Sequence, residues 1–521
     1  MGHPAIIHYQ GRRYDAAHGE AILDALLRQG APMAHSCGKG SCHTCVLKLE
    51  AGRVHHARAL DATLQASGHL LPCVAHAEGE VRLAPADMAR VATPAELMSR
   101  RHLGGGVFEI GIAPLTELSY RGGQHLQLVR SDGLARSYSL ASLPEDDFLF
   151  HLHVRHTGKG GLSHWLCELA PIGERLDLFA PQGDCHYHPG MAARRLLLLA
   201  TGAGAGALLA VARDALAAGH RQPIHLYHGV RDADGLYLHD TLRDLERRHP
   251  NVRYTACISG AGHQAGREDA RRGHVTQAFA EADGLADTSL FLCGRPAMVE
   301  DARCLAVAGG VPRAHIHADP FDPAGPARPR DAEKIAAIPP DPELWAALAC
   351  GPGLRHALER FYDRVYEDER LSPFFTRVPK ERIVSKQYSF LSDLFSGKRD
   401  FFGLKPYNAH HWMVISDELF DHHETLLAAA LRDHGLAEHL IHRIGGLLER
   451  FRAEIVKPVA RGMVIDGRQL PLQVDEVETL DLDGVCDGCG GEIPAGRPVR
   501  YQHRLGTLHC AGCAGLPAVT G

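Results

Sequence analysis

The pattern of apolar and polar residues divides the chain into regions that differ in their predicted secondary structure. Residues 1–92 predict short strands, a helix near Ala21–Gln29 and a loop rich in cysteine. Residues 95–190 contain β-rich segments, such as Phe148–Val154 and Arg175–Phe179, that polar turns separate. Short strands divided by turns predict a small antiparallel barrel.

Short apolar strands alternate with helical stretches between residues 191 and 321, which predicts a doubly wound α/β fold around a parallel sheet. The strands are Leu196–Ala200, Ile224–Tyr227, Tyr254–Ile258 and Leu290–Cys293, and the helices include Leu208–Ala217 and Leu238–Arg247. Only Leu196–Ala212 resembles a membrane span. Its glycines and the flanking arginines favour a buried strand, a glycine turn and a helix.

Proline marks the next boundary, at Asp322–Arg330 and again at Ile338–Pro342. Proline at this density disfavours helix and central strand, so residues 322–342 predict an extended linker. Residues 343–460 show apolar positions three and four apart, the helical pattern. Residues 461–521 form a tail rich in glycine and proline. The fold class is therefore multidomain.

Composition and charge are those of an ordinary multidomain protein. The 521 residues exceed what one core supports, and 45% hydrophobic with 23% charged residues is typical of soluble domains. A formal charge of −6 without a Lys/Arg block disfavours a nucleic-acid partner. The first residues lack a signal peptide's cationic segment and apolar core, so we expect a cytoplasmic protein with no membrane partner.

Cysteine is the first sign of specific chemistry, because eight of the fourteen cysteines fall into two tight sets. Clustered thiols in a chain that looks cytosolic indicate metal sites rather than disulfides. The sets are Cys37, Cys42, Cys45 and Cys73, and then Cys486, Cys489, Cys510 and Cys513.

The first set has the spacing Cys-x4-Cys-x2-Cys, and Cys73 follows after 27 further residues. Gly38, Gly40 and Ser41 let the loop wrap around a cluster and aim its amide N–H groups at the sulfurs. Zinc more often takes paired Cys-x2-Cys motifs, so the spacing favours a [2Fe–2S] cluster. Residues 1–92 resemble plant-type ferredoxins, and the resemblance implies a β-grasp fold.

A flavin motif lies in the predicted barrel, at Arg136-Ser-Tyr138-Ser139. Through it, residues 95–321 resemble the ferredoxin–NADP reductase family, and the resemblance implies FAD as cofactor. Arg136 would pair with a flavin phosphate, Tyr138 would pack on the isoalloxazine ring and Ser139 would bond to its N5 edge. A second matching turn consists of Gly161, Leu162 and Ser163. In the family this turn presents a helix N-terminus to phosphate.

Two further motifs lie in the predicted α/β region. Gly202 and Gly204 stand between its first strand and helix, a position that favours dinucleotide phosphate binding over mere tight packing. Cys293-Gly294-Arg-Pro-Ala-Met298 matches the reductase family's Cys-Gly-x-Pro-x-Met turn. The match implies that Cys293 and Gly294 lie near nicotinamide and flavin. The alternative for Cys293 is a buried thiol at the end of a strand.

The end of this module bears on both the flavin and the dinucleotide. The segment before Phe321 resembles the family's closing segment, which implies that this aromatic ring covers the flavin. The choice between NADH and NADPH depends on local charge, since a 2′-phosphate needs a cationic clamp. Arg231 could supply one, but Asp232 and Asp234 would repel the phosphate, so NADH is favoured.

Residues 343–460 resemble truncated haemoglobins through the aromatic landmarks Phe361-Tyr362 and Phe374-Phe375 and through a histidine-bearing stretch. The resemblance implies an all-α globin in which His410 binds the iron of haem b. Tyr362 and Gln387 would donate hydrogen bonds to a ligand such as O2 on the distal side. The family's Gly-Gly pair is missing, and a haem-free sensor or a plain helical domain is the alternative.

The tail pairs Cys486-x2-Cys489 with Cys510-x2-Cys513 across 20 residues, the spacing of a zinc ribbon. A closed thiolate shell would fold a small unit that has little core of its own, so we expect a structural or docking role. His509 in place of Cys510, and rubredoxin-like iron, are alternatives.

Together these parts predict an NAD(P)H-dependent oxidoreductase that passes electrons through FAD and a [2Fe–2S] cluster to a globin haem. Flavohaemoglobins join a globin and a reductase, so nitric oxide dioxygenation, with NO and O2 as small-molecule partners, is the leading hypothesis. The alternative is a reductase for a separate oxygenase, with the globin as an O2, NO or redox sensor. In a third hypothesis the globin and tail recruit the reductase to another protein.

Overall fold

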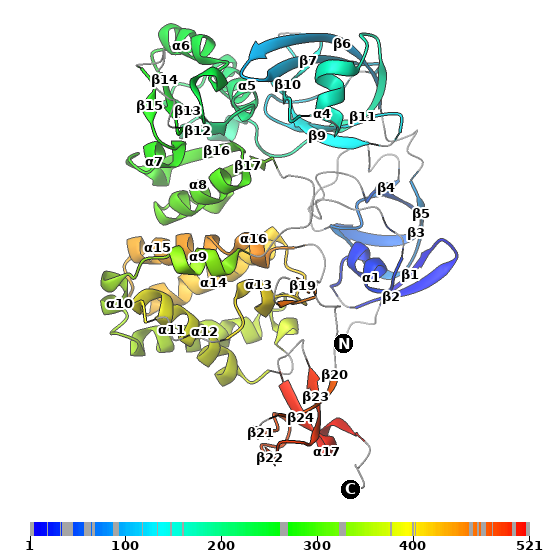
Figure 1. Ribbon diagram of the computed structural model, residues 1–521, viewed down its shortest axis with the longest axis vertical. Coiled ribbons are helices and arrows are strands. Elements are labelled where there is room, and N and C mark those ends of the chain that lie inside the picture. The colour runs from blue at the N-terminus through cyan, green and yellow to red at the C-terminus, as the bar shows by residue number, and fades with distance from the viewer. Residues whose placement is uncertain are drawn as a thin grey trace. The chain divides into compact units, whose positions relative to one another are not determined.

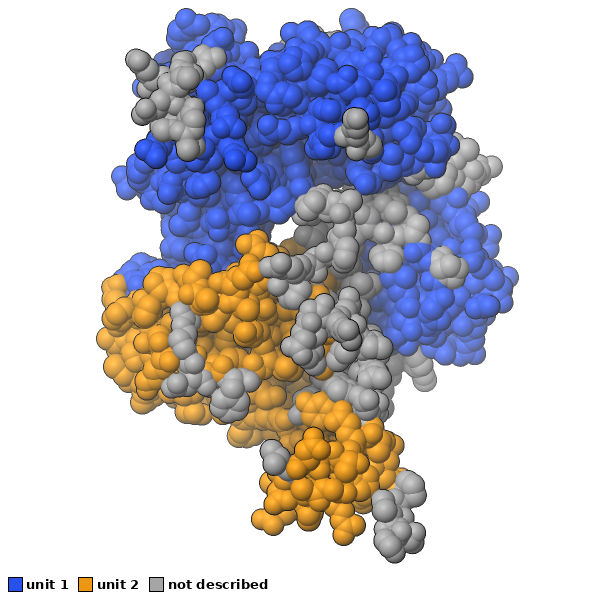
Figure 2. Space-filling view, viewed as in Figure 1, with its two compact units in different colours: residues 1–326, 439–450 blue, residues 327–438, 451–521 orange. Residues whose placement is uncertain are grey.

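The chain folds into two compact units (Figure 2), one of residues 1–326 with 439–450 and the other of residues 327–438 with 451–521. Figure 1 shows their elements in a computed structural model. The structure describes residues 5–17, 19–31, 33, 45–56, 64, 68–86, 93–116, 118–132, 134–145, 148–158, 161–260, 269–321, 330–375, 378–398, 401, 403–457, 462–465, 468–469, 476–481, 483–502 and 507–516.

The N-terminal part of the first unit is a mixed five-stranded sheet in the order β2-β1-β5-β3-β4. Its strands are β1 (Ala5–Tyr9), β2 (Arg12–Ala16), β3 (Leu47–His56), β4 (His69–Leu70) and β5 (Ala75–Pro85). Alternate residues of β1 are buried, the period-two pattern of a strand with one face on the core. Helix α1 (Ile22–Arg28) buries its apolar face and confirms the helix predicted here. A mixed sheet with one packed helix agrees with the fold that the resemblance to ferredoxins implies for residues 1–92.

A closed antiparallel barrel follows, with the strand order β10-β7-β6-β11-β8-β9. An antiparallel bridge between Leu140 and Leu152 joins the two ends of this sheet and removes its free edges. The strands are β6 (Thr93–Gly104), β7 (Val107–Pro114), β8 (His125–Val129), β9 (Ala135–Ser139), β10 (Phe150–Arg155) and β11 (Arg175–Gln182). The barrel predicted from the turn pattern is confirmed.

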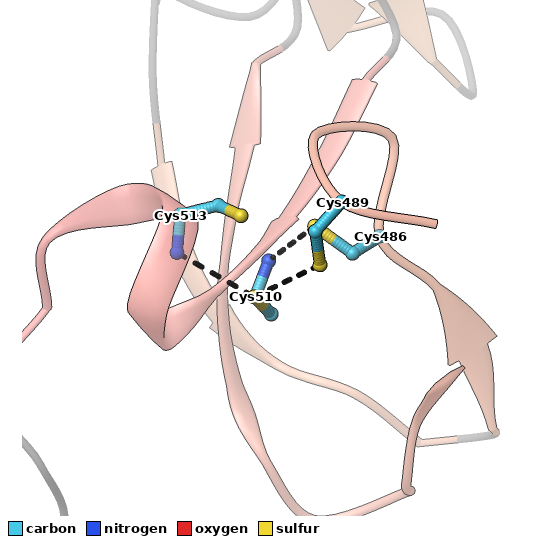
Figure 3. A group of neighbouring side chains, drawn as sticks. All are labelled: Cys486, Cys489, Cys510 and Cys513. Carbon is cyan, nitrogen blue, oxygen red and sulfur yellow. Dashed lines mark hydrogen bonds between the residues drawn. The ribbon is translucent and has the colours of Figure 1, made fainter. Parts of the chain in front are cut away.

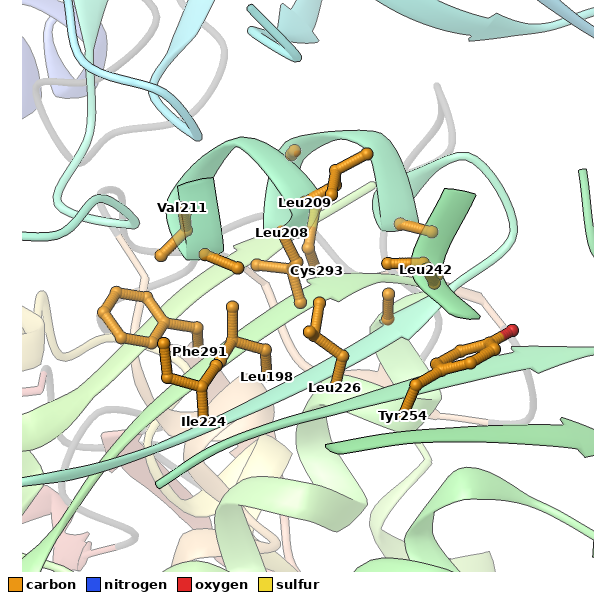
Figure 4. Close-up of a cluster of buried hydrophobic side chains, with 14 of the residues drawn as sticks. Leu198, Leu208, Leu209, Val211, Ile224, Leu226, Leu242, Tyr254, Phe291 and Cys293 are labelled. Carbon is orange, nitrogen blue, oxygen red and sulfur yellow. The ribbon is translucent and has the colours of Figure 1, made fainter. Parts of the chain in front are cut away.

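The rest of the first unit is a parallel sheet in the order β15-β14-β13-β12-β16-β17, with helices on its two faces. Its strands and helices are β12 (Arg195–Thr201), α5 (Gly204–Ala217), β13 (Ile224–Val230), α6 (His239–Arg248), β14 (Val252–Ile258), β15 (Arg271–Arg272), α7 (Val275–Phe279), β16 (Thr288–Gly294), α8 (Pro296–Ala308) and β17 (Ile316–Pro320). The central strands are apolar because both faces are covered (Figure 4). The chain reverses strand order between β12 and β16, where such sheets bind ligands.

The second unit is mainly helical. Its helices are α9 (Asp331–Ala337), α10 (Pro342–Ala347), α11 (Pro352–Glu367), α12 (Lys380–Ser396), α13 (Pro406–Ala409), α14 (Asp417–Asp433) and α16 (Arg452–Ile455), and α15 (Glu438–Glu449) contributes residues 439–449 to the first unit. Among the described residues, no helix combines the length and apolar character that a membrane crossing requires. Leu196–Ala212 instead forms β12, a turn and the start of α5, as predicted.

The predicted linker needs one correction, because Asp331–Ala337 form helix α9 rather than extended chain. The prolines flank this stretch and leave its interior with alanine, glutamate and lysine, which favour helix. The buried Lys334 Nζ donates to Glu454 Oε2 at 2.7 Å, and the Tyr407 amide donates to Asp331 at 2.8 Å. Tertiary contacts therefore hold the second half of residues 322–342 in the helical unit.

The tail contains a three-stranded sheet in the order β20-β23-β24, two short ribbons and one helical turn. Its elements are β18 (Val464–Ile465), β19 (Arg468–Gln469), β20 (Glu476–Thr479), β21 (Gly484–Val485), β22 (Glu492–Ile493), β23 (Pro498–Gln502), β24 (Thr507–Cys510) and α17 (Ala511–Ala514). Among the described residues of the tail, one apolar cluster has Cys486, Ile493 and Val499 as its buried members.

Candidate functional site

The iron–sulfur prediction can be followed through two of its four cysteines, since Cys37 and Cys42 lie outside the described residues. Cys45 and Cys73 are both buried and belong to one apolar cluster, although 27 residues separate them in the sequence. Phe179 of barrel strand β11 packs in the same cluster. The positions of Cys45 and Cys73 therefore fit ligands of one [2Fe–2S] cluster, and that iron–sulfur cluster would lie against the flavin barrel.

The flavin motif occupies strand β9, which pairs with β8. Arg136 is exposed on β9, where its guanidinium is accessible to an anion. Tyr138 packs on the barrel core, and burial raises the pKa of its phenol. Ser139 lies opposite His125 in the register and donates its hydroxyl to Asp319. Three neighbouring residues thus offer a cation, a ring and a hydroxyl, which fits a flavin.

The second flavin turn is helical, since Gly161, Leu162 and Ser163 lie in α4 (Gly161–His164), which continues into a π-helical turn. Leu162 is buried in the barrel core, so its side chain anchors the turn. Gly161 has a φ of +75°, a conformation that favours glycine. Ser163 hydrogen-bonds Thr157 at 2.8 Å between hydroxyl oxygens. The described residues of the turn can offer a phosphate backbone amides and small polar groups.

The glycines of the nucleotide turn have different reasons for being glycine. Gly202 has a φ of +57°, in the left-handed region. A Cβ on Gly204, the first residue of α5, would collide with the backbone of Cys293. Close packing, the alternative considered above, therefore explains why residue 204 is glycine. Gly204 also begins a helix at the point where the strand order reverses, and this position fits dinucleotide binding.

Cys293 and Gly294 end strand β16, beside the glycine turn. Cys293 is fully buried, and this burial raises the pKa of its thiol well above the ordinary value. Gly294 has a φ of +131°, and a side chain there would strike Thr201. Phe321 donates its amide to the Gly294 carbonyl at 2.7 Å, while its ring is 40% exposed. An exposed ring is available to stack on a cofactor.

Asp319 on β17 is a site residue that the sequence analysis missed. One carboxylate oxygen accepts the Ser139 hydroxyl at 2.5 Å and lies 4.0 Å from the Cys293 sulfur. The other oxygen lies 4.0 Å from Nδ1 of His125. Burial raises the pKa of the Asp319 carboxyl, an effect that His125 opposes. Asp319 lies at the end of β17, directly beside Cys293 at the end of β16 in the parallel register. A polar residue at the end of the last predicted strand was the sequence feature that could have indicated it.

A second missed network joins the barrel to the glycine turn. Glu109 on β7 lies 3.6 Å from Nε2 of His153 on β10, and the His153 Nδ1 lies 2.9 Å from the Tyr237 hydroxyl. That hydroxyl donates to the Ala203 carbonyl at 3.2 Å. The hydrogen bond from His153 lowers the pKa of Glu109 to about 2, although burial opposes it. The network fixes the turn relative to the barrel.

In the helical unit, the two predicted distal residues meet. Tyr362 on α11 is 5% exposed and donates its hydroxyl to Oε1 of Gln387 on α12. The Phe361 and Phe375 rings lie 4.9 and 5.9 Å from the Tyr362 ring, between centroids. Burial raises the pKa of Tyr362, so the phenol stays protonated and can donate. An apolar setting with a paired donor fits the distal side of a haem.

The predicted proximal histidine lies at the C-terminal end of the short helix α13, not on the face of a long helix. Nδ1 of His410 lies 2.8 Å from the Pro406 carbonyl, and Nδ1 of His411 lies 2.7 Å from the Asn408 carbonyl. A carbonyl only accepts, so Nδ1 donates and the lone pair sits on Nε2, the tautomer suited to iron. Both histidines qualify by this criterion, and His411 is the more buried at 3% exposed.

The four tail cysteines converge at the junction of β21, β24 and α17 (Figure 3). Burial disfavours ionisation of Cys486, but backbone amides from Cys510, Cys489 and Gly488 outweigh it and lower its pKa to about 6. Hydrogen bonds among the four sulfurs raise the pKa of Cys513 to about 12. Closely packed thiols resist joint ionisation unless a cation compensates their charge.

Four family models match successive parts of the chain. They describe a 2Fe-2S iron-sulfur cluster binding domain (residues 6–78), an oxidoreductase FAD-binding domain (106–187), an oxidoreductase NAD-binding domain (198–304) and a bacterial-like globin (344–457). The cofactors predicted from these parts, FAD, NAD(P)H, a [2Fe–2S] cluster and haem, are thereby confirmed at the level of the domain. The matched domains also confirm an oxidoreductase.

Two similar proteins are reductase components. The aromatic O-demethylase reductase subunit of Amycolatopsis is 33% identical over 60% of this chain and 97% of its own length. The terephthalate 1,2-dioxygenase reductase component 2 of Comamonas is 30% identical over 62% of this chain and 98% of its own length. Among solved structures, the Amycolatopsis cytochrome P450 reductase GcoB matches with 30% identity and a TM-score of 0.45, over 62% of this chain and all of that one. The chain therefore belongs to the family of reductase components that join a [2Fe–2S] ferredoxin domain to FAD- and NAD-binding domains, and it carries a bacterial-like globin domain in addition.

Proposed function

We propose that the reductase part of the chain passes electrons from NADH to its own globin, which then converts nitric oxide to nitrate. The observation that carries this proposal is the hydrogen bond between the buried Tyr362 and the half-buried Gln387. Two polar groups from different helices cost free energy to bury, and a paired donor in an apolar setting is what a polar ligand such as dioxygen needs.

The reductase residues supply the path at the other end. When bound, FAD accepts hydride, the cluster relays single electrons and haem binds the diatomic gas. Asp319 contacts both Ser139 and the fully buried Cys293, and these three residues would face the place where nicotinamide and flavin meet. Phe179 packs with Cys45 and Cys73, which supports a short path from barrel to cluster.

The reaction balances for one dinucleotide. Two molecules of NO, two of O2 and one NADH give two nitrate ions, NAD⁺ and one proton, and the two electrons of the hydride are used singly. In the globin, Tyr362 and Gln387 would hold the ligand by hydrogen bonds, and His410 would hold the iron. NADH is favoured because the exposed Asp232 and Asp234 beside Arg231 would repel a 2′-phosphate.

Anaerobic addition of NADH to the full-length protein, followed by NO and O2, tests the proposal. We expect reduced-haem bands before the gases are added and nitrate afterwards. Tyr362→Phe should keep the bands and lower nitrate formation about tenfold, because one donor is lost. Cys73→Ser should keep flavin reduction and slow haem reduction. Haem that stays oxidised under NADH would refute the proposed electron path.

The iron ligand is tested by a matched pair of variants. His410→Ala should abolish the haem bands without changing flavin absorption, whereas His411→Ala should retain them. The opposite result would assign the iron to His411, whose Nδ1 is held in the same way.

A second candidate function is electron supply to a separate oxygenase, with the globin as an O2, NO or redox sensor. This candidate is favoured by the similarity to the two reductase components named above, because the similarity spans nearly the whole length of both. Here NADH-dependent reduction of an added oxygenase should persist in His410→Ala, and wild-type protein should form no nitrate.

A further inference from the structure

The tail contains a cluster of four thiols that matches the geometry of a metal site (Figure 3). The sulfur atoms of Cys486, Cys489, Cys510 and Cys513 all lie within 4.8 Å of one another. Those of Cys489 and Cys510 are 3.9 Å apart, too far for a disulfide. Sulfurs bound tetrahedrally to Zn²⁺ at about 2.3 Å stand about 3.8 Å apart, so the spacing fits a tetrathiolate site.

We propose that these four cysteines hold Zn²⁺ and that the zinc-loaded tail fixes the first turn of helix α12, which carries Gln387. The tail is thus a metal-dependent clamp on the distal side of the globin. The consequence for ligand binding rests on the proposed function, because it requires haem in the globin.

Backbone amides are arranged around the sulfurs as a thiolate site requires. The amides of Gly488 and Cys510 donate to the Cys486 sulfur at 3.4 and 3.2 Å. The Cys513 amide donates to the Cys510 sulfur at 3.5 Å. Such bonds compensate negative charge on sulfur and orient the ligands before the ion arrives. Four neutral thiols would have no need of them.

The described part of the tail has only a small apolar core. Its apolar cluster has three fully buried members, and one of them is the ligand Cys486. Units of this size with so little core depend on a metal or other cross-link for folding. Zinc is therefore a folding requirement of the tail, and every contact made by its loops depends on it.

One of those contacts is made by Asp487, which lies between the first two cysteines. Its Oδ2 accepts the Leu508 amide at 2.7 Å, and its own amide donates to the Leu508 carbonyl at 2.8 Å. These bonds join the first cysteine loop to β24, the strand that leads to Cys510. The second carboxylate oxygen, Oδ1, pairs with the guanidinium of Arg382.

Arg382 lies in the first turn of α12, and the Arg382–Asp487 pair is partly shielded, with side chains 26% and 31% exposed. Gln387 follows five positions later on the same helix, about 7.5 Å along its axis. The helix keeps this spacing rigid, so an anchor at Arg382 limits the motion of Gln387 and of its hydrogen bond with Tyr362. Arg382 and Asp487 are positioning residues.

Metal analysis of the full-length protein tests the site itself. We expect about one zinc per chain, lost on Cys486→Ser. Replacement by Co²⁺ should produce thiolate-to-metal absorption bands. A chain without zinc, or with iron at these cysteines, would overturn the assignment.

The clamp is tested with all four cysteines in place. Asp487→Asn removes the charge that pairs with Arg382, and Glu492→Gln removes an exposed carboxylate from the same tail as a matched control. We expect CO rebinding to the reduced protein after photolysis to change about fivefold in Asp487→Asn and not in Glu492→Gln. Arg382→Gln should act in the same direction, and the double variant should add little to either single change.

Hydrogen exchange provides a readout that needs no haem. Amides of residues 380–387 should exchange about fivefold faster in Asp487→Asn, and in zinc-stripped protein, than in Glu492→Gln. If haem bands are absent from the wild type, the proposed function fails, and exchange alone then decides the clamp. Equal exchange in the Asp487 and Glu492 variants would refute it.

Discussion

The nucleotide-binding domain and the tail illustrate two ways of holding a fold together. In the former, strand β16 is buried along its whole length, and the side chains of Leu198, Leu226 and Phe291 interlock beneath helix α5 (Figure 4). In the described part of the tail, the apolar cluster has three buried residues. The first is stabilised by the apolar area it removes from water, whereas the second needs a cross-link.

Cysteine shows the difference within one residue type. In the nucleotide-binding domain, burial raises the pKa of Cys257 to about 11 and that of Cys304 to about 12, so both act as small apolar residues. In the tail, backbone amides outweigh burial and lower the pKa of Cys486 to about 6. Whether a cysteine is suited to bind a metal therefore depends on the groups around its thiol, here on backbone amides that favour the thiolate.

Metal removal should have the largest effect. A strong chelator should unfold residues 476–516, because zinc contributes on the order of 10 kcal/mol to such units. Hydrogen exchange should then rise to unprotected rates in β23 and β24 and stay slow in β12 and β16. If the tail strands stay protected after complete metal removal, the tail is stabilised without zinc, as the nucleotide-binding domain is.

A core truncation should have the next largest effect. Phe291→Ala should lower the free energy of unfolding of the nucleotide-binding domain by about 3–5 kcal/mol, because the fully buried ring leaves a cavity. Phe148→Ala is a matched control, since that ring is 100% exposed and its loss should change stability by less than about 0.5 kcal/mol. Denaturant titrations of the two variants give the comparison.

The ferredoxin domain adds a buried charge to the contrast. Asp24 is 5% exposed, neither carboxylate oxygen has a hydrogen-bond partner among the described residues, and burial, with Glu20 nearby, raises its pKa to about 8. The folded pKa exceeds the ordinary 3.8, so Asp24 contributes stability below about pH 4 that is lost as pH rises to about 8.

Asp24→Asn should remove this dependence on pH. The variant should match the wild type near pH 4 and exceed it by about 4 kcal/mol near pH 7, as measured by denaturant unfolding at several pH values. Glu78→Gln, an exposed site on β5, should leave the wild-type slope in place. Parallel pH profiles for wild type and Asp24→Asn would contradict the burial argument.

A helix cap should have the smallest effect. The Ser416 hydroxyl accepts the Leu419 amide at 3.1 Å at the start of α14, so Ser416→Ala should cost about 1 kcal/mol of unfolding free energy. Ser389→Ala, at an exposed position within α12, should be neutral or slightly stabilising, because alanine favours helix. A neutral Ser416→Ala would show that tertiary packing alone holds α14.

Local patterns predicted the regions of the chain well. The alternating segments of residues 191–321 became β12, α5, β13, α6, β14 and β16, because apolar periodicity and strand length act over few residues. The linker prediction was wrong because proline content registers neither the helix-favouring residues between the prolines nor the contact of Lys334 with Glu454, 120 residues away. The prediction that Cys37 and Cys42 join Cys45 and Cys73 stays a prediction.

Cysteine ligands that lie a few residues apart could be predicted from the sequence, because a Cys-x2-Cys loop brings its two sulfur atoms close together in any fold. Contacts between distant strands and helices could not. Asp319 meets Ser139 across 180 residues, only because β17 joins the sheet in register with Cys293 and the barrel delivers β9 beside it. Asp487 meets Arg382 across 105 residues for the same kind of reason. Spacing along the chain determines which groups can act together locally, and only packing of whole elements decides which distant groups complete a site.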